Sequence, residues 1–186
     1  MHYREALARD VGDIVAIHVT GGQQAYADIL PSAYLEDTMP TEKRDLWRSR
    51  LENGLDQSKL SVTVAEEADD VAGFACFLFD QETDFGTYLH NIYVAKRYQR
   101  RGVASGLLNS GIGSFQPSRL EHPVHLLVFD KNTPARAFYE RLGGEMIEET
   151  VRSRAGSGPI ALCRYQWPSA NTLRDNSLRL ALGARA

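Results

Sequence analysis

The chain has 186 residues, 43% of them hydrophobic and 24% charged, and it carries a net charge of −3 at pH 7. This length and composition fit one globular domain, or one domain with a tail. The slightly acidic charge argues against nucleic acid or an anionic membrane surface as a partner.

Cysteine usage and the N-terminal sequence indicate a compartment. The two cysteines, Cys76 and Cys163, lie inside apolar runs and show neither a disulfide framework nor the spacing of a metal site. The chain opens on the polar sequence MHYREALARD, and no apolar run approaches the ~18 residues of a membrane span. We therefore expect a cytoplasmic protein with no metal, no signal peptide and no membrane association.

The first third of the chain predicts two helices. Residues 10–29 carry apolar side chains at helical spacing, and the pair Gly21-Gly22 predicts that this helix ends or bends there. Residues 31–39 predict a loop with a short turn. Residues 41–54 predict the second helix, which ends at Asn53-Gly54.

The middle of the chain predicts three strands in a meander. Residues 60–67 alternate between apolar and polar side chains, and residues 71–79 form a nearly continuous apolar run, which is typical of a central strand. A polar loop at 80–86 leads to a third strand at 87–94. Because the connections are short, neighbouring strands are expected to be antiparallel.

The rest of the chain alternates helix and strand. The predicted elements are a helix at 102–112, a strand at 123–129, a short helix within 130–144, and strands at 145–152 and 159–167. The last two strands bracket the sequence RAGSG, a candidate hairpin loop. Residues 168–186 predict either a short amphipathic helix or a disordered tail. We expect one α/β domain over 1–167 and a separate C-terminal tail over 168–186.

The segment RYQRRGVASG, residues 97–106, joins the strand at 87–94 to the next helix. A helix N-terminus presents unpaired N–H groups, and Gly102 lets a ligand approach the backbone closely. Arg100 and Arg101 add positive charge, so the segment predicts a site for a phosphate or diphosphate. The alternative is an ordinary turn with solvated arginines. Neither the G-x-x-x-x-G-K-[ST] nor the G-x-G-x-x-G phosphate-binding pattern is present.

Three segments in order resemble the GNAT superfamily of acyl-CoA-dependent N-acyltransferases. The first, LHNIYVAKRY, resembles the family's fourth strand, and the second, Gln99-Arg-Arg-Gly102-Val-Ala104, resembles its Q/R-x-x-G-x-G/A signature. The third, VHLLVFDKNTPARAFYERLGGE, resembles the family's next strand and helix. The resemblance covers about residues 60–147, is looser over 1–55 and leaves out the tail.

This resemblance implies a fold and a cofactor. The implied fold is a mixed, mostly antiparallel sheet of six to seven strands, flanked by helices and splayed between its fourth and fifth strands. Acetyl-CoA is the implied co-substrate, with its pantetheine arm in the splayed gap and its pyrophosphate on the loop. The implied cofactor-binding residues are Ile92, Tyr93, Val94, Gln99, Arg100, Arg101, Gly102, Val103, Ala104, Ser105 and Asn132. For Asn132, an N-cap of the following helix is the alternative.

The resemblance also implies catalytic groups. Tyr139 is expected to protonate the leaving CoA thiolate, unless it is a core aromatic residue. A backbone N–H near Val94 is expected to stabilise the oxyanion. Many members of the family carry a glutamate early in the fourth strand, where this chain has Tyr88.

The general base is therefore open. His90 lies two residues after Tyr88, so a regular strand places it on the same face as Tyr88 and Ile92, and its unperturbed pKa suits a base. The alternative is a strand histidine that bonds to a neighbour. Other candidate bases are Glu82, Asp84, Glu66 and Glu67.

Residues 20–50 are expected to form the acceptor pocket. Tyr26, Tyr34 and Trp47 are candidates for its walls. Acidic residues such as Asp28, Glu36 and Asp37 slightly favour a cationic acceptor, and Lys43 and Arg44 offset part of that preference. The sequence thus predicts an acetyl-CoA-dependent N-acetyltransferase that acts on a primary amine of a small molecule or peptide by direct attack in a ternary complex. A catalytically silent acyl-CoA-binding regulatory module is the alternative, and a homodimer is compatible with either.

Overall fold

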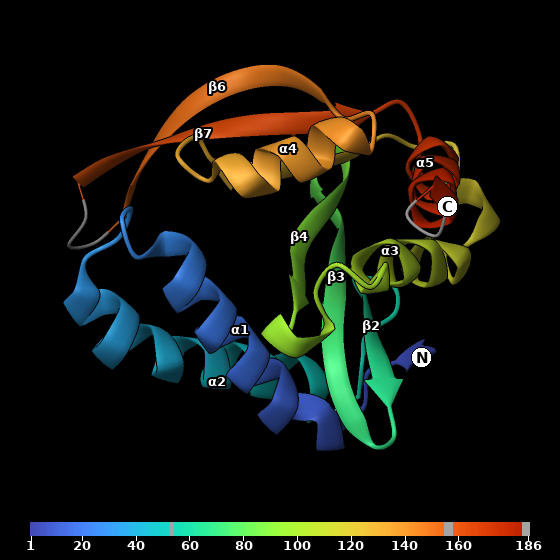
Figure 1. Ribbon diagram of the computed structural model, residues 1–186. Coiled ribbons are helices and arrows are strands. Elements are labelled where there is room, and N and C mark those ends of the chain that lie inside the picture. The colour runs from blue at the N-terminus through green and yellow to red at the C-terminus, as the bar shows by residue number, and fades with distance from the viewer. Residues whose placement is uncertain (53, 155–157, 184–186) are drawn as a thin grey trace.

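The computed structural model describes residues 1–52, 54–154 and 158–183, which form one sheet flanked by helices (Figure 1). The strands are β1 (His2–Glu5), β2 (Leu60–Glu67), β3 (Asp70–Glu82), β4 (Gly86–Val94), β5 (Val124–Phe129), β6 (Glu145–Arg154) and β7 (Gly158–Trp167). The α-helices are α1 (Val11–Tyr26), α2 (Met39–Leu51), α3 (Val103–Gly113), α4 (Thr133–Arg141) and α5 (Ala170–Gly183). None of the helices in the described ranges is long and apolar enough to cross a membrane.

The sheet is mixed, and it divides at one place. Its strand order is β1-β2-β3-β4-β5-β7-β6, with antiparallel pairs throughout except for the parallel pair β4–β5. That parallel pair shares only two registered positions, Thr87 with Val124 and Tyr88 with His125, before the strands separate. The predicted mixed sheet with a splay between its fourth and fifth strands is confirmed.

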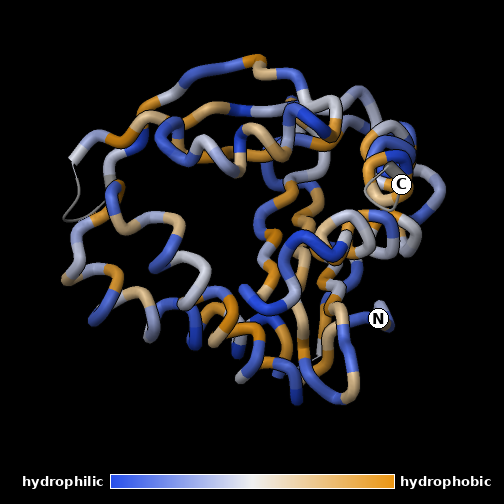
Figure 2. Tube along the Cα trace, viewed as in Figure 1, coloured by the Kyte–Doolittle hydropathy of each residue, from blue (hydrophilic) through white to orange (hydrophobic). Residues whose placement is uncertain are grey.

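Helices cover both faces of the sheet, and the central strand β3 contributes side chains to the core on each face. Phe74 and Cys76 pack with α1 and α2 in one core cluster, whereas Ala75 and Phe77 pack with α3 in another. Consecutive side chains of a strand point to opposite faces, so the nearly continuous apolar run of β3 fills two cores. Figure 2 shows the hydrophobic residues gathered on the central strands and the inward faces of the helices.

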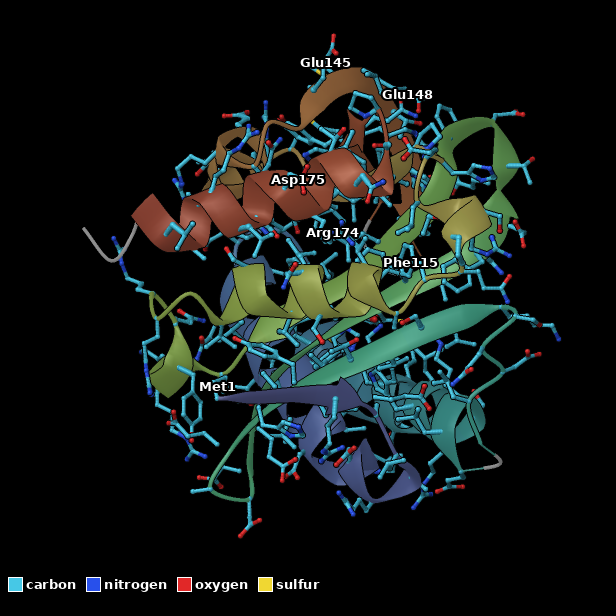
Figure 3. The ribbon with its side chains drawn as sticks, turned by 90° about the vertical axis from the view of Figure 1, so that its right-hand side faces the viewer. Met1, Phe115, Glu145, Glu148, Arg174 and Asp175 are labelled. Carbon is cyan, nitrogen blue, oxygen red and sulfur yellow. The ribbon has the colours of Figure 1, made fainter. Side chains whose placement is uncertain are left out.

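The C-terminal segment forms α5, which lies alongside α3 (Figure 3). Ala170 and Leu173 of α5 are fully buried within the α3 core cluster. Of the two alternatives for residues 168–186, the structure therefore has the helix over 170–183. Because α5 closes the core above α3, it contributes to the same globular unit as the sheet.

The N-terminal strand β1 was missing from the predicted elements. It pairs with β2 at the edge of the sheet, in register from His2 with Glu66 to Glu5 with Thr63. Its sequence, HYRE, offers no alternation of apolar and polar side chains. Ion pairs from Arg4 to Asp10 and Glu66 hold it in place, and contacts of this kind leave no periodic signal.

The predicted end of the first helix at Gly21-Gly22 is wrong. Helix α1 continues to Tyr26, because the two glycines are needed for close packing rather than for a turn. A Cβ atom on Gly21 would lie 2.6 Å from the ring of Tyr93, and one on Gly22 would lie 3.2 Å from the sulfur of Met39.

Other boundaries differ by a few residues. β3 continues to Glu82, so the predicted loop at 80–86 shortens to a 3-10 turn at Thr83–Phe85. α2 starts at Met39 with Pro40 in its first turn, where the missing N–H of proline costs nothing. Asn53 and the centre of the predicted hairpin loop, residues 155–157, lie outside the described residues.

Candidate active site

A cavity of about 1120 Å³ lies where β4 and β5 separate. It is lined by β4, the loop after it, the first turn of α3, β5, α4 and the segment that joins α1 to α2. The strands part because β4 bonds to β3 along its whole length, whereas β5 turns away to pair with β7 from Val124 to Phe129. The gap in the sheet is thus a result of strand pairing.

The free edge of β4 offers hydrogen-bonding groups to this cavity. The N–H of Ala95 donates to the carbonyl oxygen of Ala72 at 2.9 Å, on the β3 side. Because consecutive residues of a strand direct their N–H and C=O groups to opposite sides, those of Ile92 and Val94 point into the gap. Gln99 Nε2 donates to the Val94 carbonyl at 3.0 Å, which ties the loop to the end of β4.

The loop after β4 has the backbone of an anion site. Arg100 has a φ of 60° and Gly102 has a φ of 78°, so two left-handed residues flank Arg101. Such changes of hand turn successive N–H groups toward one point. The first helical hydrogen bond at this end runs from the Gly106 N–H to the Gly102 carbonyl at 3.0 Å. The N–H groups of Val103, Ala104 and Ser105 therefore have no acceptor within the helix.

The two loop arginines face different surroundings. Arg100 lines the cavity. Arg101 does not, because its guanidinium bonds to both carboxylate oxygens of Glu67, at 3.0 and 3.1 Å, and lies over the ring of Tyr98. Of these two arginines, only Arg100 therefore lines the space where a phosphate would bind.

Asn132 lies at the other wall of the cavity, before α4. Its Oδ1 accepts a hydrogen bond from the Ala135 N–H at 3.4 Å, so it is the N-cap of that helix, and it also lines the cavity. The cap uses the carbonyl oxygen and leaves the two donors of the amide nitrogen. The cap and a contact to a bound ligand are therefore compatible.

Tyr139 projects from α4 into the cavity. Its ring packs beside Tyr165 and Trp167, with centroid separations of 6.1 and 6.3 Å. Burial raises the pKa of the Tyr139 hydroxyl, so it stays protonated at neutral pH. The hydroxyl bonds to no group of the described residues. Such a phenol can donate a proton to a thiolate that forms beside it.

His90 lies at a bulge in β4. Cys76 of β3 pairs with Asn91 and Phe77 pairs with Leu89, so His90 is the extra residue. The expected face shared by His90 and Ile92 is therefore wrong. Ile92 packs with the α3 cluster, whereas His90 approaches Arg50 of α2. A bulge interrupts the two-residue period on which that expectation rested.

The imidazole of His90 is neutral at physiological pH. Burial and the nearby charge of Arg50 lower its pKa to about 4. Its Nδ1 lies 2.6 Å from Oδ1 of Asn91, so the proton sits on Nδ1 and Nε2 keeps a lone pair. Tyr88 packs edge-on against it, with ring centroids 5.4 Å apart.

The carboxylates that were alternative bases are occupied elsewhere. Glu82 pairs with Arg164 at 2.8 Å, Glu66 pairs with Arg4, and Glu67 pairs with Arg101. None of them lines the cavity, and neither does Asp84.

Two of the three aromatic residues predicted to wall an acceptor pocket lie at the cavity. Tyr26 and Tyr34 line the cavity, and the hydroxyl groups of Tyr26 and Tyr93 lie 2.7 Å apart. Trp47 is instead a core residue, fully buried and bonded through its indole N–H to Nδ1 of His18 at 3.0 Å.

The predicted acidic lining is wrong. Asp28, Glu36 and Asp37 are exposed and none of them lines the cavity. Lys43 of α2 and Arg152 of β6 line it instead. Sequence reasoning missed Arg152 and took Lys43 only as offsetting the acidic charge, since only the fold brings these segments, more than a hundred residues apart, to one wall.

The segment between α1 and α2 bridges the two halves of the sheet. Tyr26 contacts Phe129 of β5 edge-on at a centroid distance of 4.8 Å. Leu30, Leu35 and Met39 form a small core cluster against which Phe129 and Ile160 pack. Figure 1 shows this segment meeting the ends of β6 and β7. The cavity is thereby closed on the side of the bridge.

Comparisons with known proteins agree with this geometry. The model of the acetyltransferase (GNAT) family matches residues 23–144. A GNAT-family protein of Desulfovibrio desulfuricans has a similar structure, with a TM-score of 0.67 and 20% identity over 91% of this chain and 98% of that one.

Two other similar structures contain ligands. PaiA N-acetyltransferase of Thermoplasma acidophilum, in complex with coenzyme A, has a TM-score of 0.62 and 18% identity over 87% of this chain and 96% of that one. The yncA protein of Salmonella typhimurium, with its cofactor acetyl-CoA, has a TM-score of 0.61 and 19% identity over 90% and 92%. A search of curated proteins found no significant match.

Proposed function

The chain belongs to the acetyltransferase (GNAT) family, and we propose that it transfers the acetyl group of acetyl-CoA to a primary amine by direct attack in a ternary complex. One observation carries the proposal. A single cavity joins an anion-binding loop, an unpaired strand edge, a protonated tyrosine and a neutral histidine. Acetyl-CoA, the co-substrate of the family, supplies the activated acetyl group as a thioester.

The residues present fit this co-substrate. The N–H groups of Arg100 to Ser105 and the Arg100 guanidinium match the charge of a pyrophosphate. The edge groups of Ile92 and Val94 match the amides of a pantetheine arm, as a strand adds to a sheet edge. Asn132, with its free amide donors, completes the hydrogen-bonding set, and Tyr93, whose backbone groups face β3, contributes only through its side chain, which lines the cavity. For Gln99 and Arg101 we propose indirect roles, since Gln99 holds the loop to Val94 and Arg101 anchors it to Glu67.

Tyr139 is the proposed general acid. The amine nitrogen forms a bond to the acetyl carbon, the carbon–sulfur bond breaks, and the sulfur takes the proton of the Tyr139 hydroxyl. The Val94 N–H stabilises the charge that grows on the carbonyl oxygen. The proton lost by the nitrogen passes by way of His90 and solvent to the Tyr139 oxygen, so both groups return to their starting state and the products are the acetamide and the CoA thiol.

His90 is the proposed acceptor of the amine proton. A base with a pKa of about 4 removes a proton poorly from a free ammonium, whose pKa is about 10. Once the nitrogen has begun to bond to the carbonyl carbon, it becomes far more acidic, and a weak base is then sufficient. The Nε2 lone pair of His90 would first orient the neutral amine and then take its proton.

The experiment is thermal unfolding of the protein with acetyl-CoA, with ATP as the comparison. A ligand that binds only the folded state at about 100 times its Kd stabilises it by about 2.7 kcal/mol, which raises the midpoint by several degrees. We expect a rise with acetyl-CoA and little change with ATP. Equal rises would indicate a general phosphate site, and no rise with acetyl-CoA would overturn the proposal.

A further inference from the structure

The charged residues that line the cavity all have the same sign. They are Lys43, Arg100, Arg141 and Arg152. Among the residues that the structure describes, no aspartate or glutamate lines the cavity, and none of the seven remaining residues of the chain is acidic. A cavity lined by one sign of charge concentrates ligands of the opposite sign.

The phosphates of the co-substrate account for only part of this charge. Arg100 belongs to the loop that follows β4, and Arg141 ends α4 near α5. Lys43 and Arg152 lie at the opposite end of β4. The charge of Lys43 acts on His90, and that of Arg152 acts on Tyr88, where the charge of Glu82 acts in the opposite sense. Along the strand, Tyr88 lies roughly 20 Å and His90 roughly 13 Å from Val94 at its end, which is too far for Lys43 or Arg152 to share one pyrophosphate with the loop.

Lys43 and Arg152 reach this place from separate elements. Lys43 projects from the second turn of α2 and is half-buried. Arg152 projects from β6, and its one described ion pair, to Glu82, is long at 3.4 Å. Glu82 is held more closely by Arg164, at 2.8 Å. The guanidinium of Arg152 therefore keeps donors for another anion.

Arg50 of α2 is a third cation close to His90. Arg50 lies 3.5 Å from Nδ1 of His90 and over the ring of Trp47, and it forms no ion pair with a carboxylate of the described residues. A second ammonium group on the acceptor would meet the repulsion of these three charges. An amine that also carries an anionic group would be attracted by them and would keep its nitrogen near His90.

We propose that the acceptor is a small amine that also carries an anionic group, a carboxylate or a phosphonate, and that Lys43 and Arg152 bind this group beside His90. The inference rests on the proposed acetyl transfer and names its substrate class. It excludes polyamines and other polycations as preferred acceptors. The acidic residues of the α1–α2 segment, which favoured a cationic acceptor in the sequence, face solvent instead.

The test is a set of acceptors that share a carbon skeleton and differ in charge. Each α-amino acid is assayed next to its carboxamide, its decarboxylated amine and its aminophosphonate analogue, with spermidine as the polycation. Acetyl transfer is followed as the release of CoA thiol. We expect kcat/KM to be at least about tenfold higher for the best anionic acceptor than for its neutral partner, since one charge-assisted contact contributes that much. Comparison of the amino acid with its aminophosphonate analogue shows whether the site prefers a carboxylate or a phosphonate.

Matched variants locate the effect. Lys43→Gln and Arg152→Gln should each raise the KM for the anionic acceptor roughly tenfold and leave the KM for its carboxamide and for acetyl-CoA unchanged. Arg44→Gln is the control, because Arg44 is the next residue of α2 and lines a separate groove between α1 and α2. The midpoint of unfolding of each variant shows that it is folded.

Two kinds of failure are distinguishable. If acetyl-CoA binds and neutral amines or spermidine are preferred, or if the variants change the KM of all acceptors alike, this inference is overturned while the acetyl transfer stands. The same holds if acetyl-CoA binds and only the neutral or polycationic amines of the panel react. If acetyl-CoA binds and no amine reacts, the proposed acetyl transfer fails as well. If acetyl-CoA fails to bind at all, the proposed function itself fails.

Discussion

Arg100 and Arg101 are adjacent in the chain, yet one lines the cavity and the other is paired with Glu67. The left-handed conformation of Arg100, with a φ of 60°, helps to turn the two side chains apart. The sequence, which shows two arginines before a glycine, cannot distinguish them, since both fit a basic anion-binding loop. Their separate roles depend on the backbone.

This difference gives a prediction at the scale of the residue. Arg100→Ala should weaken acetyl-CoA binding about tenfold, because it removes a charge-assisted contact to phosphate. Arg101→Ala is the matched control and should change the affinity much less, since its charge is already neutralised by Glu67. The measurement is calorimetric titration with acetyl-CoA. An equal loss of acetyl-CoA affinity in the two variants would contradict the separate roles of Arg100 and Arg101.

At the scale of the element, Gly21 allows α1 to pack closely against β4. The helix passes so close to β4 that the ring of Tyr93 occupies the place of a side chain at this position. Tyr93 is fixed in turn by stacking on Phe74 and by its contact with the hydroxyl of Tyr26. The glycine therefore sets the wall of the cavity on the α1 side.

Replacement of Gly21 tests this packing. Gly21→Ala should lower the free energy of unfolding by about 1–3 kcal/mol, because the ring of Tyr93 must move. Gly12→Ala in the same helix has no atom within 4 Å of the new Cβ and should raise the free energy by roughly 0.5–1 kcal/mol. Urea unfolding of both variants measures the difference. If Gly21→Ala stabilised the protein, the close approach of position 21 to the ring of Tyr93 would not limit the packing of α1.

Most elements were predictable from the sequence for a physical reason. β2 alternates apolar and polar side chains, β3 is a nearly continuous apolar run because both of its faces are buried, and α3 follows a glycine with an apolar run after it. The prediction failed where distant contacts decide the structure. The edge strand β1 is held by the ion pairs of Arg4, and the bulge at His90 has no local signature.

The same limit applies to the candidate site. The proposed cofactor end lies mostly on one continuous stretch, from Ile92 to Ser105, with Asn132 added from the start of α4, and it was expected from the resemblance of those segments. The acceptor end combines α1, α2, β4 and β6, so its charge depends on the fold. Arg152 was therefore missed, Lys43 was taken only as offsetting the acidic charge, and exposed acidic residues were expected to attract the acceptor.

At the scale of the whole molecule, two histidines are kept neutral by the fold. The pKa values of His90 and His125 are both lowered to about 4, in each case first by burial and then by a nearby arginine. Nδ1 of His125 accepts a hydrogen bond from Arg164 at 2.8 Å, and its ring is stacked on Tyr88. Protonation of His125 would set a second positive charge against Arg164 in a fully buried place.

The protein should therefore lose stability between pH 6.5 and pH 4. The unfolded chain binds protons on these histidines below about pH 6.5 and the folded chain does so only near pH 4, so the free energy of unfolding falls as the pH falls through this window. His125, which is fully buried, contributes on the order of 3 kcal/mol. Urea unfolding at a series of pH values measures this loss. His125→Asn keeps an acceptor for Arg164 and should flatten the curve, whereas a wild-type curve that is already flat would contradict the buried neutral state.

The central claim is that the cavity between β4 and β5 catalyses acetyl transfer to an amine. The most direct measurement is the rate of CoA thiol release from acetyl-CoA as the concentration of acceptor amine is raised, in wild type and in Tyr139→Phe. We predict that release depends on the amine and that Tyr139→Phe lowers kcat by about a hundredfold, with an unchanged KM for acetyl-CoA. Binding of acetyl-CoA without release by any amine would contradict the claim and would identify the chain as an acyl-CoA-binding regulatory module.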